Sequence, residues 1–229
     1  MGNIGLYFGG RNVTEQHLID KTQDLDLWSG TIVSKFQYNG SSVFLQVTSH
    51  PKDPVLSIEI KSDLLVSGGL GVFFDFPYSD TNKFDAPYVG VWNETTNNTV
   101  QVRSTAHSAS FKQIADRNVQ YTFAKWSTNG SISGPLHSSN KFVLTPSGSD
   151  TLHLVVAFSP TDRVGNLPSY NEISAESQKW WADYWTSGAF IDLSATRNDK
   201  ATELQRRIIL SQYLVAVNSA SHNPPQGMY

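Results

Sequence analysis

The chain has 229 residues, of which 39% are hydrophobic and 16% charged, a composition typical of a folded protein with a sizeable core. Its formal net charge of −3, with no basic cluster, argues against a nucleic-acid-binding protein. No apolar run approaches the roughly 20 residues that cross a bilayer, so no membrane partner is expected. The absence of cysteine excludes disulfides, thiol catalysis and cysteine-ligated metal.

Apolar and polar side chains alternate along most of the chain between residues 30 and 160, as in strands with one buried face. In VLSIEIK, for example, Leu56, Ile58 and Ile60 share one face. The stretches with this pattern are TIVSKFQY, SVFLQVTS, VLSIEIK, LGVFFDFPY, NTVQVRS, NVQYTFAKW, NKFVLTP and TLHLVVAFS. Turn-forming residues stand between them, at 39–40, 67–69, 129–130 and 146–148. Short strands without intervening helices predict a mainly β fold, a large antiparallel β-sandwich in residues 1–168.

Helical spacing replaces this alternation near residue 169. Asn171 or Ser174 is the expected N-cap, and Trp181 and Trp185 stand four residues apart, about one helical turn. This helix belongs to a linker region of residues 169–198. We expect its tryptophans to pack between helix and sheet rather than to form a sugar platform, because neighbouring helical tryptophans usually supply buried area.

A second helix is predicted from Glu203 to about Asn218, in a last segment of residues 199–229 that holds a Pro-Pro stop. From Ile208 to Val217 most positions are apolar, so apolar side chains cover most of its circumference. A helix of this kind is normally buried on all sides. The sandwich and the first helix can cover only part of it, so we expect a partner over residues 203–218, either more of the same polypeptide or another chain.

Two long stretches carry a resemblance to a known group of proteins. QDLDLWSGTIVSKFQYNGSSVFLQVTSHPKDPVLSIEIKSDLL and GGLGVFFDFPY resemble the N-terminal super-sandwich domain of six-hairpin glycosidase-like proteins, which are similar to the maltose phosphorylase and trehalase type of glycoside hydrolase. WWADYWTSGAFIDLS and ELQRRIILSQYLVAVNSASHNPPQ resemble the linker helix and the first helix of the α/α barrel in the same proteins. The resemblance covers nearly the whole chain and implies a galactose-mutarotase-like super-sandwich.

The resemblance also implies that the chain is truncated at both ends. In such proteins further strands precede the segment equivalent to Asn3–Tyr7, and the catalytic barrel, with its general acid and base, follows the Pro-Pro-Gln turn. Residues 199–229 would then be the first helix of an otherwise missing barrel. We therefore carry over no catalytic residue, and no cofactor is expected.

The residues by themselves offer no catalytic pair either. Glycoside hydrolysis needs two carboxyl groups about 5 to 10 Å apart, and spacing in sequence does not provide that geometry. The acidic residues considered are Asp24, Asp26, Asp75, Asp80, Asp85, Asp183, Asp192 and Glu203. Asp75 alternates away from Phe74 and Phe76, so a surface or turn position is expected. The six histidines show no pair at ligand spacing, and no metal site is predicted.

A few residues are expected near a substrate or a glycan. Trp92, in the polar stretch YVGVWNETTNN, is the best candidate for a carbohydrate contact, and His222 and Gln226 flank the Pro-Pro turn that would face the pocket of an intact enzyme. We expect the Arg206-Arg207 pair to form surface or interdomain ion pairs. Five Asn-x-Ser/Thr sequons are candidate N-glycosylation sites, at Asn12, Asn39, Asn93, Asn97 and Asn129.

Two hypotheses about function remain open from the sequence. The first is the non-catalytic N-terminal portion of a six-hairpin glycoside hydrolase, inactive alone, whose carbohydrate is bound by the intact protein. The second is a stand-alone carbohydrate-binding or interaction module that oligomerises through its C-terminal helix. The N-terminal residues lack a signal-peptide pattern, and an extracellular location follows only if the intact protein carries one.

Overall fold

A computed structural model describes residues 2–78, 91–137, 139–162, 165–188 and 190–219. These residues form twelve strands, two long helices and two short helical turns. The strands are β1 (Asn3–Tyr7), β2 (Ile19–Asp26), β3 (Thr31–Tyr38), β4 (Ser41–Ser49), β5 (Val55–Lys61), β6 (Gly71–Asp75), β7 (Asn98–Ser104), β8 (Ser108–Ala115), β9 (Asn118–Trp126), β10 (Asn129–Ser133), β11 (Lys141–Ser147) and β12 (Thr151–Ser159). The helices are η1 (Glu15–His17), α1 (Asp63–Val66), α2 (Tyr170–Thr186) and α3 (Ala201–Ser219).

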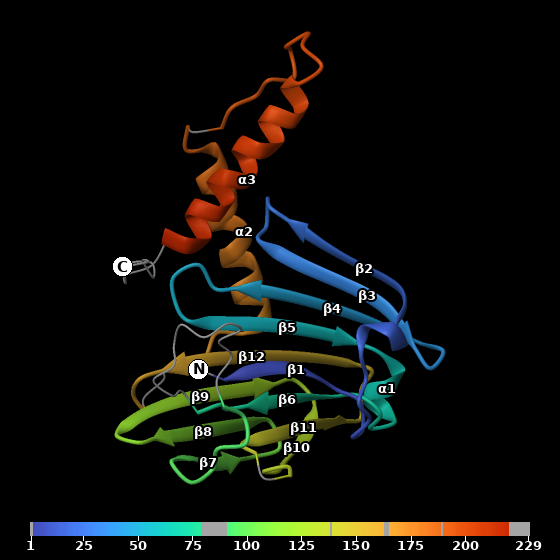
Figure 1. Cartoon of the computed structure of the whole chain (residues 1–229), viewed down its shortest axis with the longest axis vertical. Helices are drawn as coiled ribbons and strands as arrows, with labels where there is room; N and C mark the ends of the chain where they lie inside the picture. Colours follow the sequence, from blue (N-terminus) through green and yellow to red (C-terminus); the bar gives the residue numbers. More distant parts are fainter. Residues whose placement is uncertain (1, 79–90, 138, 163–164, 189, 220–229) are drawn as a thin grey trace.

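The strands form two antiparallel sheets. One has four strands in the order β1-β6-β11-β10, and the other has eight in the order β2-β3-β4-β5-β12-β9-β8-β7. The smaller sheet lies against the part of the larger one that holds β12, β9, β8 and β7, while β2 to β4 extend beyond it (Figure 1). The expected mainly β antiparallel sandwich, followed by two C-terminal helices, is confirmed.

The core between the sheets is built from the alternating residues. Phe74 and Phe76 of the small-sheet side contact Phe111 of β8, with ring centroids 5.0 and 5.2 Å apart. Phe142 of β11 completes the cluster, 5.6 Å from Phe111. Outside this cluster, Phe8 packs on Tyr38 of β3 at 4.7 Å. Burial of these rings supplies much of the free energy that holds the sheets together.

The structure differs from the expected strands in several places. The strands β1, β2, β8 and β10 lie outside the predicted set. Asn129-Gly130 begins β10 instead of forming a turn, and the turn is made by the preceding Ser127 and Thr128. A Cβ at Gly130 would stand 2.9 Å from both Leu144 and Trp126 side-chain atoms, so this glycine permits close packing. The turn expected at 146–148 begins later, because β11 runs through Ser147.

The helix α2 starts at a different cap from the two expected. Ser169 is the N-cap, its side chain accepting a hydrogen bond from the Glu172 amide while the Glu172 carboxylate accepts one from the Ser169 amide. The helix lies over β4, β5 and β12 on the outward face of the large sheet, and α3 runs beside it (Figure 1). Within the described residues, no helix is long and apolar enough to cross a membrane.

Candidate functional site

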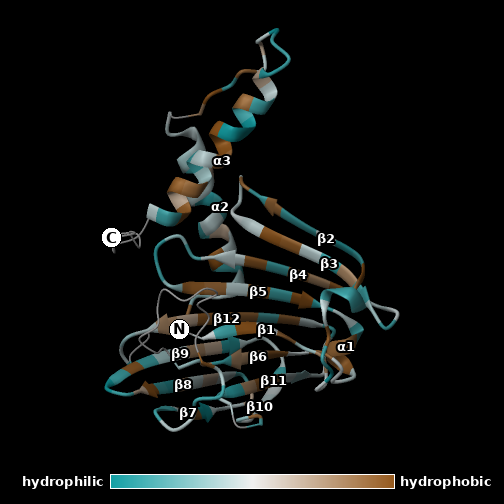
Figure 2. Cartoon of the chain, viewed as in Figure 1, coloured by the Kyte–Doolittle hydropathy of each residue, from teal (hydrophilic) through white to brown (hydrophobic). Residues whose placement is uncertain are grey.

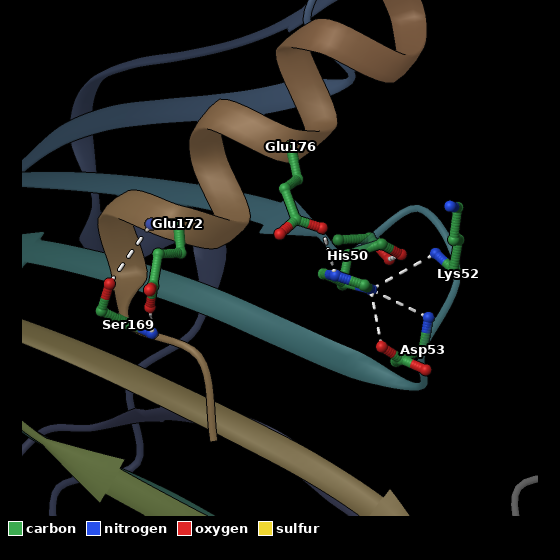
Figure 3. Close-up of polar contacts among 7 residues, drawn as sticks. His50, Lys52, Asp53, Ser169, Glu172 and Glu176 are labelled. Atoms are coloured by element: carbon green, nitrogen blue, oxygen red, sulfur yellow. Dashed lines mark hydrogen bonds and ion pairs between the residues drawn. The ribbon is translucent and has the colours of Figure 1, made fainter. Parts of the chain in front are cut away.

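The attachment of α2 to the sheet is partly polar and centres on His50, at the end of β4 (Figure 3). His50 Nδ1 accepts hydrogen bonds from the amides of Lys52 and Asp53, at 3.3 and 2.9 Å. Its Nε2 lies 2.8 Å from Glu176 Oε2 on α2. Because Nδ1 is an acceptor, the ring proton lies on Nε2 and is donated to Glu176. The β4–β5 turn is thereby tied to the middle of the helix.

The α2 helix also holds the β2–β3 turn. Trp185 Nε1 donates a hydrogen bond to the carbonyl of Leu27 at 2.7 Å, and Ser177 Oγ donates one to the carbonyl of Ser29 at 3.0 Å. The Trp181 indole lies directly against Gly30, where a Cβ would stand 1.9 Å from its Nε1. Trp181 and Trp185 are 7% and 6% exposed, so they pack between helix and sheet as expected.

Aromatic side chains join α3 to α2. The rings of Trp181 and Tyr213 stack at 5.0 Å, and Tyr184 Oη donates a hydrogen bond to the carbonyl of Gln212 at 3.0 Å. Ala216 is also buried in this contact. Burial raises the pKa of Tyr213, which keeps this ring neutral. One side of α3 is therefore fixed by packing on α2.

The opposite side of α3 exposes large apolar side chains. We define the α3 apolar surface by five residues with exposed fractions of 38 to 63%: Leu204, Leu210, Leu214, Val215 and Val217. Figure 2 shows that hydrophobic and hydrophilic segments alternate along α3. Several large apolar side chains exposed on one side of a helix often mark an interaction site.

The charged residues of α3 pair with each other at its first turns. Glu203 accepts hydrogen bonds from Arg206 Nε and Arg207 Nε, both at 2.7 Å. These two guanidinium groups lower the pKa of Glu203 to about 2. The arginine pair therefore forms surface ion pairs within the helix, as expected, and Glu203 is a fixed anion unsuited to carrying a catalytic proton.

The other acidic candidates have structural roles or no described partner. Asp26 caps the β2–β3 turn through the Trp28 amide and the Ser29 hydroxyl. Asp183 forms a salt bridge with Lys179 at 2.6 Å, and Asp192 accepts a hydrogen bond from the Ser194 amide at 2.8 Å. Asp24 is exposed on β2. Asp80 and Asp85 lie outside the described residues.

Asp75 is buried, which corrects the expected surface position. It does point away from the core, but it is only 5% exposed because β1, β11 and their side chains surround it. Burial raises its pKa, although Lys141 Nζ lies 3.2 Å from Oδ2 and opposes the shift. Its Oδ1 has no hydrogen-bond partner among the described residues. A carboxyl group with a raised pKa is a feature of general acids, but the ionic partner of Asp75 among the described residues is the ammonium group of Lys141.

Of the three residues predicted to lie near a substrate, the structure describes only Trp92. Trp92 is half-buried near the start of the segment that leads into β7, and His222 and Gln226 lie outside the described residues. The five sequon asparagines are all exposed, so burial rules out none of them as an N-glycosylation site. Asn39 occupies the β3–β4 turn with φ of 50°.

His153, like His50, forms hydrogen bonds within the fold. His153 Nε2 lies 2.9 Å from Glu59 Oε1, and its ring stacks on Tyr170 at 4.5 Å. Burial, with a contribution from Glu59, raises the pKa of Tyr170 to about 12. Among the residues that the structure describes, no three His, Asp or Glu side chains are grouped to hold a metal ion. The roles of Gly30, His50 and Glu176 in joining α2 to the sheet could not be predicted from the sequence, because their partners are more than 100 residues away.

Comparison with solved structures shows a fold similar to that of two carbohydrate-active proteins. One is assigned as a kojibiose phosphorylase from the human microbiome, with a TM-score of 0.55 and 10% identity over 93% of this chain. The other is a bacterial glucoamylase in complex with acarbose, with a TM-score of 0.56 and 12% identity over 96% of this chain. No protein-family model matches the sequence, and no curated protein does so either.

The chain spans about a third of the length of these two proteins, 30% and 35% respectively. At this level of identity the likeness concerns the fold. It includes the sandwich together with most of the two C-terminal helices, because nearly the whole chain is covered.

Proposed function

We propose that this chain is the non-catalytic sandwich portion of a larger carbohydrate-active enzyme of the glycoside hydrolase or phosphorylase type, and that it is inactive by itself. The observation that carries the proposal is the α3 apolar surface. A helix packed on one side and apolar on the other is completed by further protein, and a following α/α barrel would supply it.

The fold comparison supports the same conclusion. Two carbohydrate-active proteins contain an arrangement similar to this one as about a third of their length. Their activities differ, since one is assigned as a phosphorylase and the other is a glucoamylase. We therefore propose that the intact enzyme transfers a glycosyl group from a di- or oligosaccharide to water or phosphate. The catalytic part of that enzyme lies outside this chain.

The acidic residues of this chain agree with a non-catalytic role. Asp26, Asp183, Asp192 and Glu203 each bind a neighbouring group of the fold, and Asp75 is enclosed beside Lys141. A glycosidase needs an acid and a base on opposite sides of the scissile bond. In our proposal both carboxyl groups come from the barrel, and Trp92 of the sandwich contributes a contact to the saccharide.

The proposal is tested by the mass of the native protein. Antibodies against this chain are used to isolate the gene product from its source, and intact mass is measured after deglycosylation. We expect a species far above 25.4 kDa that contains these peptides and turns over a glucoside. A native species of 25.4 kDa would overturn the proposal and leave the stand-alone module that self-associates through α3.

A second experiment addresses inactivity. The 229-residue chain is assayed with maltose, trehalose, kojibiose and starch, with and without phosphate. We expect no release of glucose or glucose phosphate above the buffer rate. Turnover at enzymatic rates by the purified chain would contradict a non-catalytic portion.

A further inference from the structure

The outward face of β7, β8 and β9 contains an open groove that the proposed function does not use. Its main cavity has a volume of about 580 Å³, and an adjoining cavity of about 160 Å³ shares Arg103, Ser110 and Phe123 with it. We call this the β7–β9 groove and define it by Arg103, Lys112, Tyr121, Phe123 and Lys125. It lies on the part of the large sheet away from α3 (Figure 1).

The strand register places the groove side chains in three neighbouring rows. Lys112 of β8 stands opposite Tyr121 of β9, and the next row joins Arg103 of β7, Ser110 and Phe123. In the third row Ser108 stands opposite Lys125. Lys112 and Lys125 are thus two rows apart along the strands, roughly 14 Å at 3.4 Å per residue. The two rings of β9 lie between the cations.

The three cations, Arg103, Lys112 and Lys125, belong to no salt bridge in the described part of the chain. Lys125 is nevertheless near enough to Glu172 to help lower the pKa of that carboxyl group, so Glu172 offsets part of the charge of Lys125. Asp162 lines the smaller cavity and offsets one of the charges. The groove therefore keeps a positive charge on a protein whose formal net charge is −3. Such a local reversal of sign attracts an anionic ligand.

The rings give the groove an apolar floor. Tyr121 and Phe123 are partly exposed, nearly parallel at 14°, and 6.2 Å apart between centroids. They remain open because α2 packs over β4, β5 and β12. Ring faces of this kind pack on the C–H faces of a sugar, while Gln101 and the serine hydroxyls at the rim can hydrogen-bond to its hydroxyl groups.

We propose that the β7–β9 groove binds an acidic oligosaccharide whose sugar units carry carboxylate groups. Three single charges spread over roughly 14 Å suit one carboxylate per sugar unit, and the Arg103 guanidinium can bind a carboxylate through two parallel hydrogen bonds. A nucleic-acid duplex fits less well, because its phosphates, one per about 1.7 Å of helix axis, are far denser than these cations. The inference does not depend on the proposed enzyme, since binding is measured without turnover.

The test is calorimetric titration of the protein with a hexamer of galacturonic acid, in 20 and 200 mM NaCl. The comparison ligands are maltohexaose, a sulfated dextran and oligo(dT). We expect a Kd below about 1 mM for the acidic hexamer, weaker at 200 mM NaCl because salt screens the cations. Maltohexaose, which lacks the charge, binds at least tenfold more weakly. Stronger binding of sulfated dextran or oligo(dT) would identify a general polyanion surface and overturn the inference.

Variants locate the binding in the groove. Arg103→Gln and Phe123→Ala are each expected to raise Kd at least tenfold, and Arg103→Lys by less than Arg103→Gln. Lys52→Gln, an exposed lysine on the β4–β5 turn, is the matched control and should leave Kd unchanged. Hydrogen exchange on the unmodified protein should show ligand protection in 101–125. Unchanged affinity in Arg103→Gln, or protection confined to other strands, would refute the site.

Discussion

Gly30 shows how one residue connects two elements distant in sequence. It has φ of 65° at the β2–β3 turn, and the Trp181 indole occupies the space that a side chain would need. Two separate constraints therefore select glycine here: a left-handed backbone and contact with an aromatic ring of α2. The turn would form with other φ-tolerant residues, but α2 could then not close over it.

We expect Gly30→Ala to lower the free energy of unfolding by about 3 kcal/mol, through roughly 1 kcal/mol of backbone strain and the remainder from displacing Trp181. The control is Gly40→Ala, where φ is 81° but no atom lies within 4 Å of the added Cβ. It should cost only about 1 kcal/mol. Urea unfolding measures both, and equal losses would show that Trp181 does not constrain this position.

The carboxyl group of Asp75 has a raised pKa in the folded sandwich. Burial raises its pKa in the folded state above the unfolded value of about 3.9. Between these two values the folded state binds more protons, so this residue makes stability fall as pH rises. Asp75→Asn should remove that dependence and leave stability at pH 7 unchanged or higher by about 1 kcal/mol.

The measurement is the free energy of unfolding of both proteins from pH 3.5 to 7. Glu172→Gln is the comparison, because the carboxyl group of Glu172 has the opposite effect on how stability depends on pH. The Ser169 amide and hydroxyl lower the pKa of Glu172. Its carboxylate stabilises α2 above the unfolded pKa, so the variant should lose stability at neutral pH and not in acid. Marked destabilisation of Asp75→Asn at pH 7 would show instead that the pair with Lys141 dominates.

At the scale of elements, α2 determines how the chain after the sandwich is placed. Its buried row is Ile173, Ser177, Trp181 and Trp185, spaced four residues apart along one side. Ile173 is fully buried against Val55, Val155 and Ala157. Polar contacts of His50 with Glu176 then fix the position of the helix along the sheet.

We expect Ile173→Ala to lower the free energy of unfolding by about 2 to 4 kcal/mol, because it opens a cavity under α2. Val215→Ala, on the exposed side of α3, removes a β-branched side chain that is 63% exposed. This substitution should change the free energy of unfolding by less than about 0.5 kcal/mol. Thermal or urea unfolding followed by tryptophan fluorescence reports both. A small effect of Ile173→Ala would mean that α2 is not part of the cooperative unit.

At the scale of the whole molecule, the sandwich buries its large apolar side chains, whereas the helical end leaves several of them exposed. The sandwich core buries its large rings between the sheets, whereas α3 has one packed side and one apolar exposed side. We propose that the sandwich forms without further protein and that a partner covers the outer side of α3.

We expect Leu214→Lys combined with Val217→Lys to weaken self-association of the isolated chain by at least tenfold, since two apolar side chains leave the contact. Light scattering during size exclusion measures this. The control, Thr202→Lys with Gln178→Lys, adds equal charge at exposed polar positions off the α3 apolar surface and should have less effect. In the longer enzyme the first pair should reduce activity, and unchanged activity there would show that the barrel does not cover α3.

The eight predicted strands, the two helices and the excess of apolar side chains on α3 could be predicted from the sequence, because period and side-chain type are local properties. It placed Asp75 and Asn129-Gly130 wrongly, since burial and close packing depend on neighbouring strands. The grouping of Arg103, Lys112 and Lys125 around two rings was decided only by the tertiary structure. It depends on the register of three strands, and in a β-sheet a shift of one residue would turn every side chain to the other face.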